Sequence, residues 1–527
     1  MIKELPNETL FISYICLRDS NSSGYPLRSP EVADQLFSCK SQDDIINFLQ
    51  KLEKNVRSNW NDCTSKEWFT RYLNPEENQS TFQQEAKKRE KSEEEEKSKR
   101  IPSENKSIIC LFLLSVLVHI IVLDESASLL EKKLEHPELT LFRAIRRSLK
   151  QKELEGSFVV LLDTLTTMSN FAPPSHLDRS AREGKETKNL FHPFIELKSM
   201  YLFGDLLPLS PTFTPEQYDK FFKLGRPLWN TVSDFQKRIT LAVTKLLGGT
   251  STFGETNIDQ HFAILSVRLG EQISTTSNIC TRLVNSHMAV CTNITNSRDC
   301  MDVQYCVEPI LVHAASQFWR DEYMLKILLN SWSSFLAKGY VEPGVRGEVL
   351  AKIVILRTVN VCTKGSFHHP ILLSSFLEKL GADMNSHPLK DHYLNLTHFI
   401  QLTEEPTPEL IELMWRTGTG GTLVRNTTGA DLVIPLYCTT TKTLAYILVS
   451  VKNYLRSSGE RSYPHSATSS LTPKCVFRKV ENRLPHVAVY MQFGDPPKQI
   501  SGRKISGRVD YPKDENVAPS TGMCFLI

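Results

Sequence analysis

Three charged residues in the second half of the sequence, Glu348, Asp431 and Lys452, are of the types that phosphodiester hydrolysis requires. Such cleavage needs carboxylates that hold divalent cations, which activate water, and a lysine that orients the water or offsets charge. The sequence predicts Asp431 as the principal metal ligand, Glu348 as a second ligand and Lys452 as the cation. The backbone carbonyl of Val451 would add a further oxygen ligand. The expected cofactor is therefore Mg²⁺ or Mn²⁺.

Glu348 and Asp431 each lie near the start of an expected element. The spacing of the apolar residues in 349–356 predicts a helix that begins near Arg346, with Glu348 in its first turn. Asp431 opens a run of aliphatic residues at 430–435, which predicts a strand.

Lys452 lies near the end of a second predicted strand, 444–453, and the polar residues 439–443 before it predict a hairpin turn. A further strand is predicted at 486–493, where it would complete the sheet. The glycines of this region are expected to provide turns before the Asp431 strand. They are Gly418, Gly420, Gly421 and Gly429.

A second acidic pair, Asp124 and Glu125, follows the sixteen-residue apolar run 108–123. A membrane span needs about 20 apolar residues, so a buried strand of a parallel sheet is favoured over a membrane helix. An amphipathic helix predicted at 139–150 and another apolar run at 158–163 extend this strand into a βαβ unit.

The carboxyl ends of such strands hold the functional groups of open parallel sheets, which predicts Asp124, Glu125 and Thr166 as cofactor-binding residues. An acidic strand end is also where nucleotide hydrolases hold Mg²⁺. The glycine-rich loop that binds phosphate is missing before this strand, and the nearest match, 249–256, has Glu255 in place of the lysine. ATP hydrolysis is therefore not expected, and an acidic helix N-terminus explains Asp124 and Glu125 equally well.

An ordered series of segments resembles one family. The segments are 124–126, 142–147, 166–174, 284–288 and 307–311, followed by the helix of Glu348, the strand of Asp431 and Val451-Lys452-Asn453. This series resembles the Crinkler-type effectors or toxins of fungi and oomycetes. The resemblance implies a degenerate P-loop NTPase-like region and a C-terminal PD-(D/E)XK nuclease-like domain, which cleaves nucleic acid with Mg²⁺ and could be regulated by the NTPase-like region.

One residue departs from the nuclease pattern. Two positions before Lys452, where that superfamily has Glu, Asp or Gln, this sequence has Ser450, and a hydroxyl is a poor Mg²⁺ ligand beside a carboxylate. Taken singly, Glu348, Asp431 and Lys452 also fit ordinary structural positions at element ends. The alternative function is a non-catalytic module that binds nucleic acid or protein.

The composition limits the remaining possibilities. The 62 Lys and Arg residues nearly balance the 59 Asp and Glu residues, so a basic surface must be local. The stretch 451–513 has twelve basic against four acidic residues, a local charge of +8, which predicts contact with nucleic acid there. Hydrophobic residues make up 40%, which is typical of a folded protein.

The sequence also predicts an intracellular location, because no signal peptide is evident and the twelve cysteines form no zinc or disulfide pattern. The nucleus is one of the intracellular locations that this prediction allows. The last four residues, from Cys524, loosely fit a prenylation pattern. The oligomeric state stays open.

The expected fold class is α/β, with a parallel-sheet domain, a helical connector and a restriction-endonuclease-like mixed α/β domain. The expected segments are a helical lead-in at 1–80, a charged linker at 81–106, a degenerate NTPase-like domain at 107–250, a helical connector at 251–335 and a nuclease-like domain at 336–527.

Overall fold

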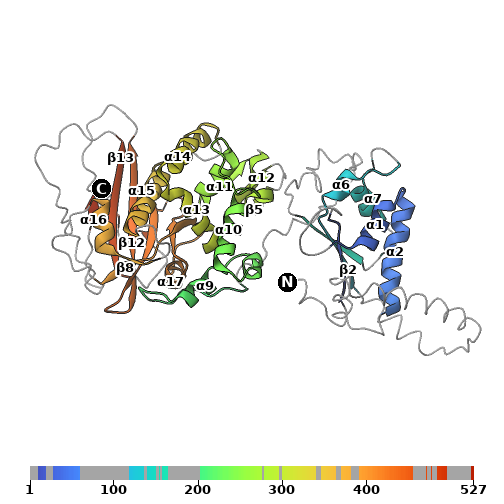
Figure 1. The fold of residues 1–527 in the computed structure, drawn as a ribbon, viewed down its shortest axis with the longest axis horizontal. Coiled ribbons are helices and arrows are strands. Elements are labelled where there is room, and N and C mark those ends of the chain that lie inside the picture. The colour runs from blue at the N-terminus through green and yellow to red at the C-terminus, as the bar shows by residue number, and fades with distance from the viewer. Residues whose placement is uncertain are drawn as a thin grey trace, which may run out of the picture. The chain divides into compact units, whose positions relative to one another are not determined.

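The chain divides into two compact units, residues 1–185 and 186–527, which are visible in Figure 1. The computed structural model describes residues 10–18, 28–59, 118–135, 139–149, 154, 157–163, 202–275, 278–295, 300–339, 346–363, 369–381, 391–425, 427–454, 471, 476–477, 484–494 and 524–526. The expected charged linker, 81–106, lies outside these residues.

A three-stranded parallel sheet forms the centre of the first unit, with strand order β1-β2-β3. The strands are β1 (Leu10–Cys16), β2 (Val118–Asp124) and β3 (Ser157–Leu162). All pairs are parallel, so the three carboxyl ends meet at one edge of the sheet. The strand interpretation of the apolar run before Asp124 is confirmed for β2, and residues 108–117 lie outside the described part.

The segment expected to be a helical lead-in also contains a strand, because the first element of its described part is β1. The sequence of β1 is continuously apolar apart from Ser13, as is typical of a strand buried on both faces. Its partner β2 lies more than one hundred residues further along the chain, as the pairing of Leu10 with Val118 shows. The first expected segment therefore contributes a strand to the sheet as well as helices.

The helices of this unit cover one face of the sheet. They are α1 (Pro30–Ser38), α2 (Gln42–Asn59), α6 (Ser128–Glu131) and α7 (Leu141–Ser148). Ile15 and Leu123 pack among these helices, whereas Tyr14 and Val122 belong to a smaller apolar cluster. This alternation of apolar residues between two clusters is the period of a strand with both faces buried.

The second unit is built on an eight-stranded mixed sheet, in which β14-β13-β12-β11-β10-β9 are neighbours and β8 joins β11 to β7. The strands are β7 (Ile371–Leu372), β8 (His392–Leu394), β9 (His398–Gln401), β10 (Thr419–Thr422), β11 (Leu432–Cys438), β12 (Thr443–Tyr454), β13 (His486–Gly494) and β14 (Cys524–Leu526). The predicted hairpin is confirmed: β11 and β12 are antiparallel. The predicted strand at 486–493 is also confirmed, as β13, which is parallel to β12.

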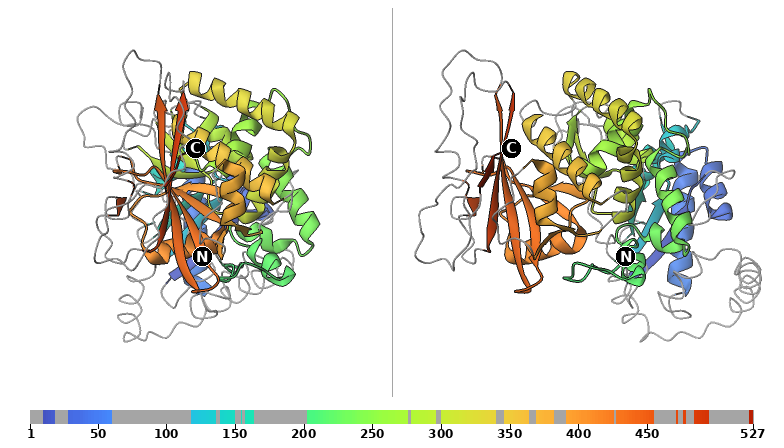
Figure 2. Two further views of the ribbon diagram at one scale, coloured as in Figure 1. Left: turned by 90° about the vertical axis from the view of Figure 1, so that its left-hand side faces the viewer. Right: turned by 60° about the vertical axis from the view of Figure 1, so that its left-hand side comes forward.

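Helices and a small sheet complete this unit. The helices are α9 (Pro215–Phe221), the 3-10 helix η4 (Pro227–Thr231), α10 (Phe235–Leu246), α11 (Ile258–Leu269), α12 (Asn278–Ser286), α13 (Pro309–Arg320), α14 (Glu322–Ala337), α15 (Arg346–Cys362), α16 (Leu373–Leu380) and α17 (Pro408–Thr417). The small antiparallel sheet has the order β4-β6-β5, formed by β4 (Ile273–Thr275), β6 (Met301–Gln304) and β5 (Val290–Ile294). Figures 1 and 2 show α11, α13, α14 and α15 together on one side of β12 and β13.

The expected connector, 251–335, therefore lies within the second unit and contains the small sheet as well as helices. The expected segment 107–250 spans the division between the units at residue 185. The fold class as a whole is mixed α/β, as predicted. Among the described residues, no helix combines the length and the apolar character that a membrane span requires.

The glycines of the sheet differ in part from their expected role as turn residues. Gly418 ends α17 in a left-handed conformation and Gly429 also has a positive φ, as turn glycines do. Gly420 and Gly421, however, lie inside strand β10. A Cβ atom at Gly420 would lie 2.6 Å from the ring of Phe399, so close packing explains this glycine.

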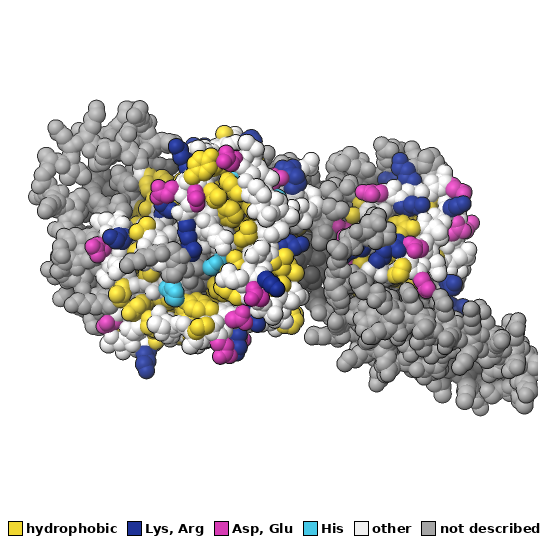
Figure 3. Space-filling view, in the orientation of Figure 1, with side chains coloured by type: hydrophobic (Ala, Val, Ile, Leu, Met, Phe, Trp, Pro, Cys, Tyr) yellow, Lys and Arg dark blue, Asp and Glu magenta, His cyan; other side chains and the backbone are white. Residues whose placement is uncertain are grey.

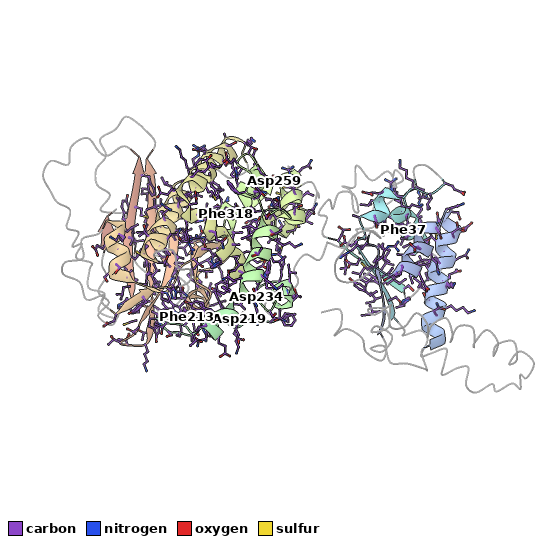
Figure 4. All side chains as sticks on the ribbon, in the orientation of Figure 1. Phe37, Phe213, Asp219, Asp234, Asp259 and Phe318 are labelled. Atoms are coloured by element: carbon purple, nitrogen blue, oxygen red, sulfur yellow. The ribbon has the colours of Figure 1, made fainter. Side chains whose placement is uncertain are left out.

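Polar contacts fix the start of α10 and join α10 to α9 in the second unit. Asp234, labelled in Figure 4, begins α10 by accepting a hydrogen bond from the backbone N–H of Lys237 at 2.7 Å. Asp219, also labelled there, accepts a hydrogen bond from the fully buried Arg238 at 3.0 Å. Burial of this guanidinium is thus matched by a carboxylate.

Candidate metal site where two strands separate

Asp431 directly precedes β11, at the point where β11 and β12 separate. Its backbone N–H donates to the carbonyl of Val449 at 2.8 Å. Its carboxylate oxygen Oδ2 accepts a hydrogen bond from the backbone N–H of Val451 at 2.5 Å. The carboxylate oxygen therefore accepts the hydrogen bond that a backbone carbonyl would accept if the pairing of β11 with β12 continued. This bond holds the carboxylate beside β12.

The backbone of Val451 faces the same place. The N–H and C=O groups of one strand residue point to the same side of the strand. Because the N–H of Val451 points to Asp431, its carbonyl is also directed toward that side of β12. The predicted carbonyl ligand and the predicted principal carboxylate thus lie on one side of one strand.

Glu348 approaches Asp431 from helix α15, which packs against β12. Burial raises the pKa of the Glu348 carboxyl group, the charge of Asp431 raises it further, and the ammonium group of Lys352 lowers it. Burial also raises the pKa of Asp431, while the N–H of Val451 and the charge of Lys452 lower it. The fold therefore brings together Glu348, Asp431 and Lys452, which the sequence predicted to act together.

Two residues beside this group were not predicted. Lys352 follows Glu348 by one helical turn, is 1% exposed, and its Nζ donates to the carboxylate of Glu271 at 2.7 Å. The same ammonium group lies 5.8 Å from the ring centre of Phe399. The spacing of Glu348 and Lys352 was a detectable signal of proximity. No local signal pointed to Glu271, which is 81 residues from Lys352.

Ser450 is also inside the structure, 1% exposed, and pairs in register with Tyr490 on β13. It brings no carboxylate to the position where the nuclease pattern has an acid. Within the described residues there is no group of three or more His, Cys, Asp and Glu side chains that could hold a metal ion. The arrangement offers two carboxylates and a backbone carbonyl, and oxygen ligands of this kind suit Mg²⁺, which usually keeps several waters.

The acidic pair of the first unit lies at the carboxyl edge of the parallel sheet, where it was predicted. The carboxylate of Asp124 accepts hydrogen bonds from the hydroxyl of Tyr14 at 2.5 Å and from the backbone N–H of Glu125 at 3.0 Å. Glu125 forms an ion pair with Arg18 at 3.2 Å. Nearby, Asp163 accepts a hydrogen bond from the backbone N–H of Ala127. Thr166, the third predicted residue, lies outside the described residues.

The described residues include a part of the predicted nucleic-acid surface. On the face shown in Figure 3, basic and acidic side chains are interspersed over the described residues. Most of the basic stretch 451–513 lies outside the described part of the chain, apart from β12, β13 and a few residues between them. Lys452 is the basic residue of this stretch that acts on Asp431.

Two family matches cover most of the chain. Residues 1–197 match a family described as a domain of unknown function (DUF8735), and residues 253–499 match another domain of unknown function (DUF8736). The first match covers the first unit, and the second lies within the second unit and includes Glu271, Glu348, Asp431 and Lys452. No curated protein and no solved structure matches the chain.

Proposed function

We propose that the second unit is a Mg²⁺- or Mn²⁺-dependent nuclease of the PD-(D/E)XK type, in a protein related to Crinkler-type effectors or toxins. The observation that carries this proposal is the pair of partly buried carboxylates, Glu348 and Asp431, at the separating strands. Two carboxylates that repel each other in a partly buried place lower each other's tendency to ionise. A divalent cation between them would relieve that repulsion.

Each residue of the site would have a separate role in hydrolysis. Asp431 and Glu348 would hold the cation, with the carbonyl of Val451 as a third protein ligand. When bound, the cation would activate a water molecule and stabilise the charge that develops on the phosphate. Lys452, whose charge acts on Asp431, would orient that water or the phosphate oxygen. The N–H of Val451 fixes the direction of the Asp431 carboxylate before any cation arrives.

A second candidate function is binding of nucleic acid without cleavage. Ser450 favours it, because this buried serine replaces the acid that would be the next metal ligand. In this case Asp431 and Glu348 would hold a cation that contacts phosphate, and no water would be activated. In either function the Asp124 carboxylate, which accepts a hydrogen bond from Tyr14, would take no part in binding the cation, and the first unit would regulate the second.

The deciding experiment is cleavage of labelled single- and double-stranded DNA and RNA by the purified full chain with Mg²⁺, Mn²⁺ or EDTA. We expect metal-dependent cleavage that falls at least about 100-fold in Asp431→Asn and Lys452→Met. Asp124→Asn, an equivalent change in the first unit, is the matched control and should cleave normally. If the folded wild type does not cleave any substrate but shifts nucleic acid in a metal-dependent way, the binding function replaces the nuclease. If Asp124→Asn is as inactive as Asp431→Asn, the assignment of the site is wrong.

A further inference from the structure

Arg268 is a buried cation in a different part of the second unit. It lies in the last turn of α11, whose residues from Gln260 to Leu269 are all buried, and it is 1% exposed. Its guanidinium carbon lies 5.0 Å from the ring centre of Trp319 on α13. Its Nη2 donates to the side-chain oxygen of Asn360 on α15 at 3.3 Å. The Nε and Nη1 atoms have no hydrogen-bond partner among the described residues.

Other buried cations of this unit have a carboxylate, and Arg268 does not have one in the described part of the chain. Arg238 binds Asp219 at 3.0 Å and Lys352 binds Glu271 at 2.7 Å. The charged group that acts on Arg268 is instead Arg320, which repels it. Burial, and then Arg320, lower the pKa of Arg268 to about 9, so it stays protonated at neutral pH. A buried charge that has an aromatic ring beside it but no opposite charge is still unfavourable.

The neighbouring polar groups add donors and no negative charge. The side-chain nitrogen of Asn360 and the indole nitrogen of Trp319 have no partner among the described residues. His398 also faces this charge, and burial together with Arg268 lowers its pKa to about 3, so it is neutral. The carbonyl end of α11 favours a cation, but it carries only a partial charge, and its carbonyl at Ser266 already accepts the N–H of Gly270.

We propose that Arg268 forms the centre of a buried site for a small monovalent anion, with chloride as the probe. N–H donors of Arg268, Asn360 and Trp319 would bind the anion, and its charge would offset that of the guanidinium. The site is separate from the metal site and does not rest on the proposed function. Asn360 follows Glu348 by twelve residues on α15, which is about 18 Å along a helix. The chemistry differs too, since the first site attracts cations.

The test is thermal unfolding of the full chain in sodium gluconate, with gluconate replaced stepwise by chloride at constant ionic strength. A bound anion stabilises only the folded state, so above the Kd the melting temperature should rise with the logarithm of the chloride concentration, by roughly 3–5 °C at 100 times the Kd. Arg268→Met should abolish this response. Arg238→Met removes a buried arginine that has its own carboxylate, and as the matched control it should keep the response although it is less stable.

A second measurement covers the case in which Arg268→Met does not fold. Bromide-soaked crystals of the wild type should show an anomalous peak within hydrogen-bond distance of the Arg268 guanidinium. Asn360→Ala, a milder change, should weaken the chloride response by several-fold in apparent Kd. If the melting temperature does not depend on the anion, if Arg268→Met responds like the wild type, or if bromide binds elsewhere only, internal water satisfies these donors and the proposal is overturned.

Discussion

Each unit has an aspartate at one end of a strand, at the carboxyl end of β2 and just before the amino end of β11, but the two carboxylates are used differently. Asp124 ends a parallel strand, and its carboxylate accepts hydrogen bonds from Tyr14 and from the N–H of Glu125. Asp431 lies where β11 and β12 separate, and it accepts one backbone N–H while a second carboxylate, Glu348, lies near enough to repel it. An acidic residue at a strand end is therefore weak evidence by itself. Its neighbours decide whether it is a structural acceptor or a cation ligand.

The buried ion pair beside the metal site should give the largest effect. Lys352→Met leaves Glu271 buried without its cation, and breaking a buried pair in this way costs about 3–5 kcal/mol. The double variant Glu271→Gln/Lys352→Met should recover part of that loss. Denaturant unfolding of the full chain, followed in the second unit by hydrogen exchange, measures both.

The matched pair in the first unit is Arg18 with Glu125, whose side chains are 15% and 37% exposed. Arg18→Met should cost about 1 kcal/mol or less, because solvent screens this pair. If Arg18→Met and Lys352→Met lower the free energy of unfolding equally, the difference in burial between the two ion pairs is contradicted.

Metal affinity tests the comparison directly. Asp431→Asn should weaken Mn²⁺ binding at least about 100-fold, which corresponds to about 2.7 kcal/mol, because it removes the negative charge of the ligand that Val451 fixes. Asp124→Asn should leave the affinity unchanged. Isothermal titration calorimetry on both variants is the measurement, and equal weakening in the two would remove the distinction between the units.

In the first unit, the hydroxyl of Tyr14 should matter for stability alone. Tyr14→Phe removes a donor from a carboxylate, and a hydrogen bond to a charged group contributes about 1.5–3 kcal/mol. The loss should appear as faster hydrogen exchange in β1 and β2, with Mn²⁺ binding and cleavage unchanged. In an Asp124→Asn background the effect of Tyr14→Phe should shrink, and an undiminished effect would contradict the pairing.

Much of the site could be predicted because its residues lie at the ends of strongly patterned elements. The apolar runs around Asp431 and Lys452 define two strands, and a short polar turn makes them a hairpin, so their proximity follows from local sequence. The proximity of Glu348 to these residues does not follow from local sequence, because it depends on the packing of α15 against β12. The contact of Glu271 with Lys352 depends on tertiary packing alone. Glu271 follows α11 and Lys352 lies in α15, and these two helices are in contact although they are far apart in sequence.

The fold was less predictable where pairing is distant. Strand β1 has the composition of a buried parallel strand, but the partner that stabilises it, β2, comes after more than fifty residues outside the described part of the chain. Gly420 and Gly421 have turn composition, yet the side chains of Phe399 and Leu402 leave no room for a Cβ atom there. At these two glycines long-range packing overrides a local preference, whereas β1 follows its local preference and depends on a distant partner.

The last prediction concerns the pH dependence of stability, whose sign follows from the raised pKa of Asp431. The ordinary pKa of an aspartate carboxyl group is 3.8. Just above this pH the unfolded chain releases the proton of Asp431, whereas the folded protein keeps it, because its pKa is raised. The folded state thus binds more protons in this window, and its stability falls as pH rises through it, by at most about 1.4 kcal/mol per pH unit for one group.

The clearest readout is the difference in unfolding free energy between the wild type and Asp431→Asn, because other titrating groups, His398 among them, contribute to both. Without metal this difference should shift in favour of the variant as pH rises from about 4. Saturating Mg²⁺ should reverse the shift, since the cation binds the ionised carboxylates and competes with their protons. If the difference is constant with pH, or if Mg²⁺ leaves it unchanged, Asp431 is not a partly buried cation ligand and the contrast between the two units does not hold.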